Sequence, residues 1–208
     1  VGTAYHLMKH FLVPRLIGKT ISDPYQARDL LHVVRDNKHT RAGLEIAVWD
    51  AFAKANKMPL VRLFERYLPE GHTSRGRASV GVSIGIQPSV EATLDIIKKR
   101  MAQGYKRIKL KIAPNWDVAL AKGVREALPD VMLMLDANSA YTLADAEHLK
   151  GLDDYNLLMI EQPLSHDDIY EHSKLQPQIK TPVCLDESIK SANDLRLALE
   201  VGALKILN

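Results

Sequence analysis

Three acidic residues, each at the end of an apolar run, follow one another at equal intervals along the chain. Asp136 ends MLMLD, Glu161 ends LLMIE and Asp186 ends VCLD, so 25 residues separate each acid from the next. About 25 residues accommodate one strand, one helix and two short loops, so neighbouring parallel strands would carry these acids at the same end. The spacing therefore predicts a cluster of three carboxylates at one edge of a parallel sheet.

A step of the same size upstream of Asp136 reaches a pair of lysines. Lys109 and Lys111, in RIKLKIA, alternate with apolar residues and so share one face of a strand. Such a pair can simply protect an edge strand from pairing with another chain. Next to three carboxylates, however, we expect both ammonium groups to face the acids across the mouth of a barrel.

Composition indicates an ordinary soluble globular protein. Of the 208 residues, 46% are hydrophobic and 25% are charged, which is enough to bury one substantial core. The net charge of +3 and the 6% of aromatic residues argue against a nucleic-acid partner, and no apolar run approaches the roughly 20 residues of a membrane span. The single cysteine, Cys184, cannot form an internal disulfide, so we expect a cytoplasmic protein.

The first part of the chain has helical patterns. Asp23 and Pro24 are typical of a helix start, and the segment from Thr40 to Lys57 places apolar residues three and four apart. The polar stretch from Glu70 to Arg77 indicates a boundary, so we predict one unit over residues 1–72 and a second over residues 73–208. The predicted stripe of the second helix consists of Leu44, Ala47, Val48, Ala51, Phe52 and Ala55.

After the boundary, strands and helices alternate. Three of the helices have a capping signature in which a hydroxyl precedes an acid by three residues: Thr142 with Asp145, Ser165 with Asp168, and Ser191 with Asp194. The βα order predicts a parallel sheet covered by helices, and acids at the strand ends favour a barrel over an open sheet. The expected strands are ASVGVSIGI, KRIKLKI, VMLMLDA, LLMIEQP, PVCLDES and LKILN.

Six strands are fewer than the eight that usually close such a barrel. We therefore expect an incomplete barrel, either a fragment of a longer protein or a natural truncation. The first residue is Val1 rather than methionine, and the sixth strand is the last one that can be recognised, ending at Asn208. Its open edge leaves homo-oligomerisation as an open alternative.

Three carboxylates that converge on one point suggest a hard divalent cation. Mg²⁺, with Mn²⁺ as the alternative, prefers oxygen ligands and keeps some positions for water or substrate oxygens. A single strand-ending acid is often only a helix cap or a loop anchor, but three in register favour a metal site. Zinc is disfavoured because no His or Cys stands at a matching strand end. Asn138 would share the face of Asp136 and would support that ligand or touch substrate.

The lysines complete a recognisable chemistry. A lysine near a cation and a second ammonium loses basicity, which brings it toward the range useful for proton abstraction. The metal and a lysine together can stabilise the enolate that forms when a proton α to a carboxylate leaves. We therefore expect a small-molecule carboxylate as the substrate. Lys205 lies at the start of its strand, only 19 residues after Asp186, and is interpreted as structural.

These elements resemble the enolase superfamily, specifically its muconate-lactonizing subgroup. Within that subgroup the chain resembles the o-succinylbenzoate synthases and the related N-succinylamino acid racemases. The likeness covers nearly the whole chain, and the lysine pair with the three acids is its most specific part. The segments that carry it are GLEIAVWDA, SVGVSIGI, GYKRIKLKIAPNWD, LMLDANSAY, MIEQPL, CLDESI and GALKILN.

The resemblance implies a (β/α)7β barrel of the TIM type with part of an N-terminal α+β capping domain, of which residues 1–72 would be the helical remainder. It implies that Lys111 is the general base, that Lys109 stabilises the enolate, and that Ser83 contacts substrate. A second catalytic lysine of the family would fall two residues beyond Asn208. The metal ligands implied for Mg²⁺ are Asp136, Glu161 and Asp186.

The resemblance also implies an activity: an Mg²⁺-dependent lyase that dehydrates a cyclohexadiene carboxylate to o-succinylbenzoate in menaquinone synthesis, with N-acylamino acid racemase activity at the same site. On its own, the 208-residue chain is expected to have little or no turnover. The alternatives are a noncatalytic remnant of such an enzyme, or a dipeptide epimerase or muconate cycloisomerase on the same scaffold.

Overall fold

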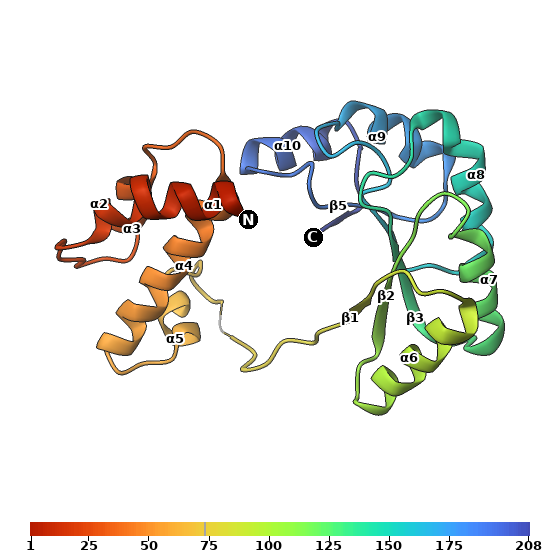
Figure 1. Cartoon of the computed structure of the whole chain (residues 1–208), viewed down its shortest axis with the longest axis horizontal. Coiled ribbons are helices and arrows are strands. Elements are labelled where there is room, and N and C mark those ends of the chain that lie inside the picture. Colours follow the sequence, from red (N-terminus) through yellow and green to blue (C-terminus); the bar gives the residue numbers. More distant parts are fainter. Residues whose placement is uncertain (73) are drawn as a thin grey trace. The chain divides into compact units, whose positions relative to one another are not determined.

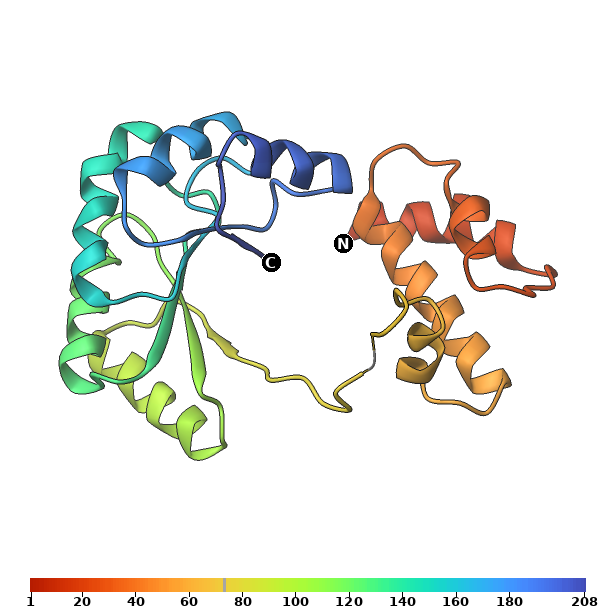
Figure 2. The ribbon, with the colours of Figure 1, turned by 180° about the vertical axis from the view of Figure 1, so that it is seen from behind.

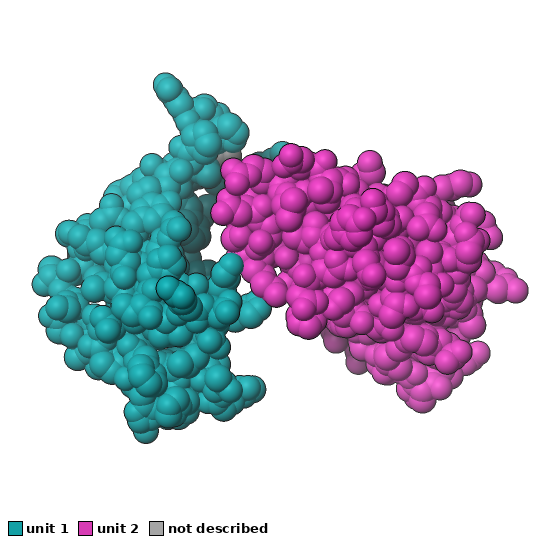
Figure 3. Space-filling model, turned by 90° about the horizontal axis from the view of Figure 1, so that it is seen from above, with its two compact units in different colours: residues 1–78 teal, residues 79–208 magenta. Residues whose placement is uncertain are grey.

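The computed structural model describes residues 1–72 and 74–208, and the chain divides into two compact units (Figure 3). Unit 1 is Val1–Ala78 and unit 2 is Ser79–Asn208. The boundary predicted between residues 72 and 73 involves Thr73, which lies outside the described residues.

The described residues of unit 1 form helices joined by turns and loops, without a strand. Besides a π-helical segment, Met8–Leu12, they are α1 (Gly2–Leu7), α2 (Val13–Leu16), α3 (Gln26–Leu31), α4 (Lys38–Ala55) and α5 (Leu60–Glu65). Helix α3 follows the predicted Asp23–Pro24 start, and the Asp23 side chain accepts a hydrogen bond from the backbone N–H of Tyr25 at 2.8 Å.

Helix α4 confirms the predicted helix, but its buried face is shifted from the predicted stripe, of which Leu44, Val48 and Phe52 are half-buried. The buried residues are Thr40, Trp49 and Ala53, whereas Ala51 of the expected stripe is exposed. The reason is the aromatic cluster around Trp49. Its ring centroid lies 5.0 Å from that of Tyr25 and 5.1 Å from those of Phe64 and Tyr67, and this packing selects the face that turns inward.

Unit 2 contains a six-stranded parallel sheet in sequential order, β1-β2-β3-β4-β5-β6 (Figure 1). This order confirms the predicted βα alternation, because each strand is added next to the preceding one as in a barrel. The strands are β1 (Val82–Ile84), β2 (Arg107–Lys111), β3 (Met132–Asp136), β4 (Ile160–Glu161), β5 (Val183–Leu185) and β6 (Ile206–Leu207).

The helices of unit 2 follow the outer face of the curved sheet, as seen from both sides (Figures 1 and 2). They are α6 (Val90–Ala102), α7 (Val118–Ala127), α8 (Ala146–Lys150), α9 (Tyr170–Leu175) and α10 (Ala192–Glu200), with 3-10 turns at Leu143–Asp145, Gly151–Tyr155 and Gln176–Gln178. In the described part of the chain, no helix is both long and apolar enough to cross a membrane.

Because side chains alternate along the strands, one face of the sheet is apolar and packs against the helices, and the other face carries the charged residues. In β2, Ile108 and Leu110 are buried in the main core with the helices, while Lys109 and Lys111 lie on the other face. The inner face carries a smaller cluster of Met134, Met159 and Cys184. The predicted shared face of the two lysines is thus confirmed.

Two of the three predicted capping signatures are confirmed. The backbone N–H of Thr142 donates to the Asp145 carboxylate at 2.8 Å, and the Ser191 hydroxyl accepts from the backbone N–H of Asp194 at 3.3 Å. These bonds satisfy backbone groups that have no partner at the start of a helix.

The prediction for Ser165 is wrong. Helix α9 begins at Tyr170, and Ser165 donates its hydroxyl to Asp167 instead. The Asp168 carboxylate serves the helix start, accepting from the backbone N–H of Glu171 at 3.0 Å. An acid three residues after a serine can therefore be the cap itself rather than the partner of one.

Candidate active site

The strand register brings four side chains to one level on the inner face. Lys111 pairs with Asp136, Asp136 with Glu161, and Glu161 with Cys184. Residues paired in adjacent parallel strands point to the same side of the sheet, so these side chains are neighbours. Asp136 is 1% exposed and Glu161 is 0% exposed.

Lys109 connects the two buried carboxylates. Its Nζ atom lies 3.0 Å from both carboxylate oxygens of Glu161 and 3.0 Å from Oδ2 of Asp136. Lys111 lies two residues after Lys109 along β2, and its Nζ atom is 2.6 Å from the same Oδ2 of Asp136. Two ammonium groups therefore balance two carboxylates, which makes their burial tolerable.

The pKa values in this group follow from burial and from charge. Burial raises the pKa of the Glu161 carboxyl; hydrogen bonds from Lys109 and Asn208 oppose the rise, and the negative charge of Asp136 adds to it. Burial lowers the pKa of Lys109, but its hydrogen bonds to Glu161 and Asp136 outweigh this effect, so the net pKa is raised.

Asp186 does not join this group. Strand β5 ends at Leu185, and Cys184 is the residue level with Glu161, so Asp186 lies two positions further along the same face. Among the described residues, no three His, Cys, Asp or Glu side chains are grouped closely enough to hold a metal ion. The structure thus brings together two of the three predicted ligands.

The donors nevertheless fit a hard divalent cation. Asp136 and Glu161 offer only oxygen atoms as ligands, and both carboxylates are buried. The Lys109 ammonium already places a positive charge between these two carboxylates. Carboxylate oxygens are the ligands that Mg²⁺ prefers. Asp186, half-buried just beyond β5, is on the face from which a third oxygen could approach.

Asn138 links Lys111 to Glu187, a residue that the sequence analysis missed. The Asn138 carbonyl oxygen accepts a short hydrogen bond from Lys111, and its amide donates to Oε1 of Glu187 at 3.0 Å. The other carboxylate oxygen of Glu187 is buried without a hydrogen-bond partner in the described part of the chain. The available signal was a second carboxylate directly after Asp186, just beyond the end of the same strand.

Ser83 lies beside Lys109 at the edge of a cavity of about 210 Å³ on the inner face. Glu161 and Asn208 also line this cavity, and the Asn208 amide donates to Oε1 of Glu161 at 2.7 Å. The available signal for Asn208 was its position at the end of the sixth apolar run, which matches the position of the acids in three other runs. The exposed Lys205 does not line the cavity.

Comparison with known proteins gives a consistent result. The chain is 49% identical to the o-succinylbenzoate synthase of Geobacillus kaustophilus and 44% identical to the N-succinylamino acid racemase of Thermus thermophilus, in each case over 100% of the chain and 54% of the relative. The chain thus spans about half the length of these curated relatives.

Solved structures agree with the relatives. A crystal structure of an enolase superfamily member from Listeria innocua matches with a TM-score of 0.85 and 41% identity, covering 100% of the chain and 54% of that protein. Residues 92–208 match the family model described as enolase C-terminal domain-like. The chain therefore belongs to the enolase superfamily, through a region similar to its C-terminal domain.

Proposed function

We propose that the inner face of unit 2 is the centre of an Mg²⁺-dependent enzyme that removes a proton α to a carboxylate. The observation that carries the proposal is the contact of Lys109 and Lys111 with two buried carboxylates, Asp136 and Glu161. Asp136, Glu161 and Asp186 would hold the ion, with Mn²⁺ as a substitute for Mg²⁺. Such an ion supplies positive charge that stabilises the carboxylate of the substrate as it gains charge.

The other steps of the reaction are assigned to side chains of this face. Lys111 takes the α-proton, and Asn138 fixes the position of its side-chain nitrogen. Lys109 supplies positive charge to the developing enolate. Ser83, at the edge of the cavity beside Lys109, contacts the substrate. Burial of the acids excludes water and strengthens each of these electrostatic interactions.

The substrate class follows from the relatives. Similarity to an o-succinylbenzoate synthase supports the dehydration of a succinyl-bearing cyclohexadiene carboxylate, a step of menaquinone synthesis, in the cytoplasm. Similarity to an N-succinylamino acid racemase supports racemisation as a second activity. Both reactions begin with the same proton abstraction. In this proposal residues 1–72 belong to the capping domain and residues 73–208 to the barrel.

Hydrogen exchange tests the proposal. A protein that contains this chain and has the length of its relatives is incubated in D₂O with an N-succinylamino acid, and deuterium at the α-carbon is followed by NMR. A parallel assay follows formation of o-succinylbenzoate by its ultraviolet absorbance. We expect Mg²⁺-dependent activity in at least one assay. No activity in either assay at saturating Mg²⁺ would contradict the proposal and favour a noncatalytic remnant.

A further inference from the structure

The buried side chain of Gln162 joins the ends of the strands that carry the acids. Gln162 directly follows Glu161 and is 0% exposed. Its backbone N–H donates to the carbonyl oxygen of Cys184 at 2.8 Å, and its own carbonyl oxygen accepts from the backbone N–H of Ser139 at 2.8 Å. The main chain of this one residue therefore links the end of β4 to β5 and to the segment after β3.

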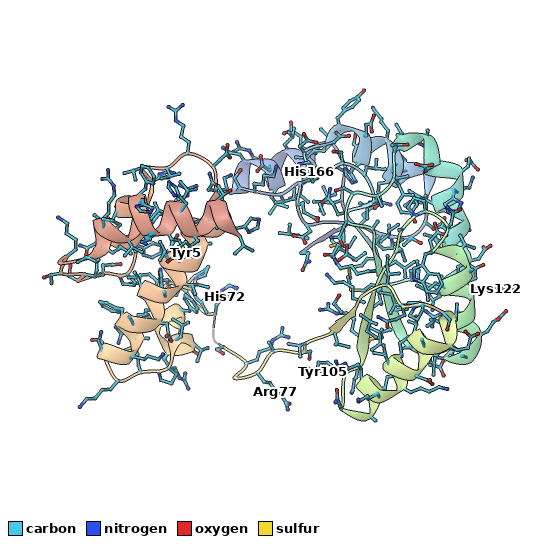
Figure 4. The ribbon with its side chains drawn as sticks, in the orientation of Figure 1. Tyr5, His72, Arg77, Tyr105, Lys122 and His166 are labelled. Atoms are coloured by element: carbon cyan, nitrogen blue, oxygen red, sulfur yellow. The ribbon has the colours of Figure 1, made fainter. Side chains whose placement is uncertain are left out.

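The side chain extends this link to Asp186. Its Oε1 atom accepts hydrogen bonds from the backbone N–H groups of Asp186 at 3.1 Å and Ser188 at 3.2 Å. Its Nε2 atom donates to the Ser188 hydroxyl at 2.6 Å and to the carbonyl oxygens of Ser165 at 3.1 Å and Leu164 at 3.3 Å. Ser165 and the neighbouring His166, labelled in Figure 4, belong to the loop between β4 and α9.

The backbone of Gln162 is held in an uncommon conformation. Its φ angle is +39°, in the left-handed region that a residue with a side chain rarely adopts. Such a conformation is energetically unfavourable and persists only where the surroundings determine it strongly. Here the five side-chain and two main-chain hydrogen bonds of Gln162 hold its backbone in this conformation.

Asp186 needs such support because it lies beyond the strand ladder. Strand β5 ends at Leu185, whose carbonyl oxygen accepts from the backbone N–H of Asn208 at 3.1 Å, whereas the N–H of the same peptide, that of Asp186, bonds to a side chain instead of a neighbouring strand. The Gln162 carboxamide binds the N–H of that peptide, and it is oriented in turn by its bonds to Ser188. A buried hydrogen-bonded group of this kind determines where the attached carboxylate can point.

We infer that Gln162 is a positioning residue for the metal centre, which sets the location of the Asp186 carboxylate relative to Asp136 and Glu161. The inference rests on the proposed function, because it assigns Asp186 to the ion. Partners that orient metal ligands typically change metal affinity by about 10–100-fold when they are removed. The same loss is expected here.

The test compares two buried glutamines that hold opposite ends of β5. Gln176 resembles Gln162 in burial and bonding: it is 7% exposed, and its Oε1 atom accepts from the backbone N–H of Val183 at 2.8 Å. Gln162→Met and the control Gln176→Met remove the same carboxamide at similar volume. For the wild-type chain and both variants, Mn²⁺ binding is measured by electron paramagnetic resonance and stability by thermal unfolding.

We expect both variants to lower the melting temperature, but only Gln162→Met to weaken Mn²⁺ binding, by about 10–100-fold. Equal Mn²⁺ affinity in the wild type and both variants would overturn the positioning role while leaving the metal centre intact. No Mn²⁺ binding by the wild-type chain would overturn the proposed metal centre and this inference with it.

A milder variant covers the case in which Gln162→Met does not fold. Ser188→Ala removes the hydroxyl that orients Gln162 but keeps the carboxamide itself. It should weaken Mn²⁺ binding in the same direction, by less than Gln162→Met. Unchanged Mn²⁺ affinity in a folded Ser188→Ala variant would count against the inference.

Discussion

Replacement of Lys111 by alanine is expected to lower the rate of α-hydrogen exchange by about 10²–10⁴-fold, the usual contribution of a positioned general base. Lys111 contacts Asp136 at 2.6 Å and also Asn138, so its amine is held in place at the edge of the buried acids. Lys111→Arg should not restore the rate, because a guanidinium is not deprotonated in proteins. The measurement is deuterium incorporation by a protein of the relatives' length that contains this chain.

Lys205 provides the matched control for this experiment. It is a lysine that directly precedes β6, but it is exposed and does not line the cavity. Lys205→Ala should therefore exchange hydrogen at the wild-type rate. If Lys111→Ala kept the wild-type rate, the assignment of Lys111 as the base would be wrong.

Replacement of Arg125 by alanine is expected to lower the free energy of unfolding by about 3 kcal/mol, because several backbone carbonyl groups, some of them partly buried, lose bonds to a charged donor. The Arg125 guanidinium donates to five backbone carbonyl oxygens from two separate segments, residues 128–131 and 155–156, and the longest of these bonds is that to Leu128 at 3.5 Å. The Nε atom binds Tyr155 at 2.9 Å, Nη1 binds Pro129 at 2.6 Å and Val131 at 3.0 Å, and Nη2 binds Asn156 at 3.0 Å.

Urea denaturation of the chain measures this effect. Arg125→Lys should recover only part of the loss, because an ammonium lacks the planar fork that reaches several carbonyls at once. Arg196→Ala is the control, since Arg196 is exposed and, among the residues that the structure describes, bonds only to Asn193 on its own helix. A free energy of unfolding for Arg125→Ala within about 0.5 kcal/mol of the wild type, the usual range for surface substitutions, would contradict the prediction.

The parts of the fold that depend on local patterns could be predicted from the sequence. The period of two in RIKLKIA was sufficient to place Lys109 and Lys111 on one face, because side chains alternate along any strand. The apolar runs predicted all six strands, and the 25-residue steps placed Lys111, Asp136 and Glu161 at one level.

Although Asp186 follows Glu161 at the same 25-residue interval, it does not lie level with Asp136 and Glu161 in the sheet. The step from Glu161 to its partner in β5 is 23 residues, since Glu161 pairs with Cys184. The 25-residue step therefore places Asp186 two positions beyond the other acids. Register depends on how each crossover helix packs, which the spacing of the acids alone does not reveal.

The side chains that hold distant parts of the backbone together could not be predicted from the sequence patterns either. Arg125 and Gln162 bind backbone groups up to 31 and 26 residues away, and a backbone N–H or carbonyl has no identity in the sequence. Trp49 selects the buried face of α4 through aromatic partners from other segments. Such contacts exist only once the elements have packed.

The most direct test of the metal centre is thermal unfolding of the chain with and without Mg²⁺, at constant ionic strength, for the wild type and for Glu161→Gln. Glu161 is the most deeply buried of the three acids and contacts Lys109 with both oxygens. Binding to the folded state alone should stabilise the wild type by about 2.7 kcal/mol at an Mg²⁺ concentration 100 times the Kd. We predict that Mg²⁺ raises the melting temperature of the wild type and leaves that of Glu161→Gln unchanged. The account would be contradicted if Mg²⁺ left the wild type unchanged, or if it raised both melting temperatures equally.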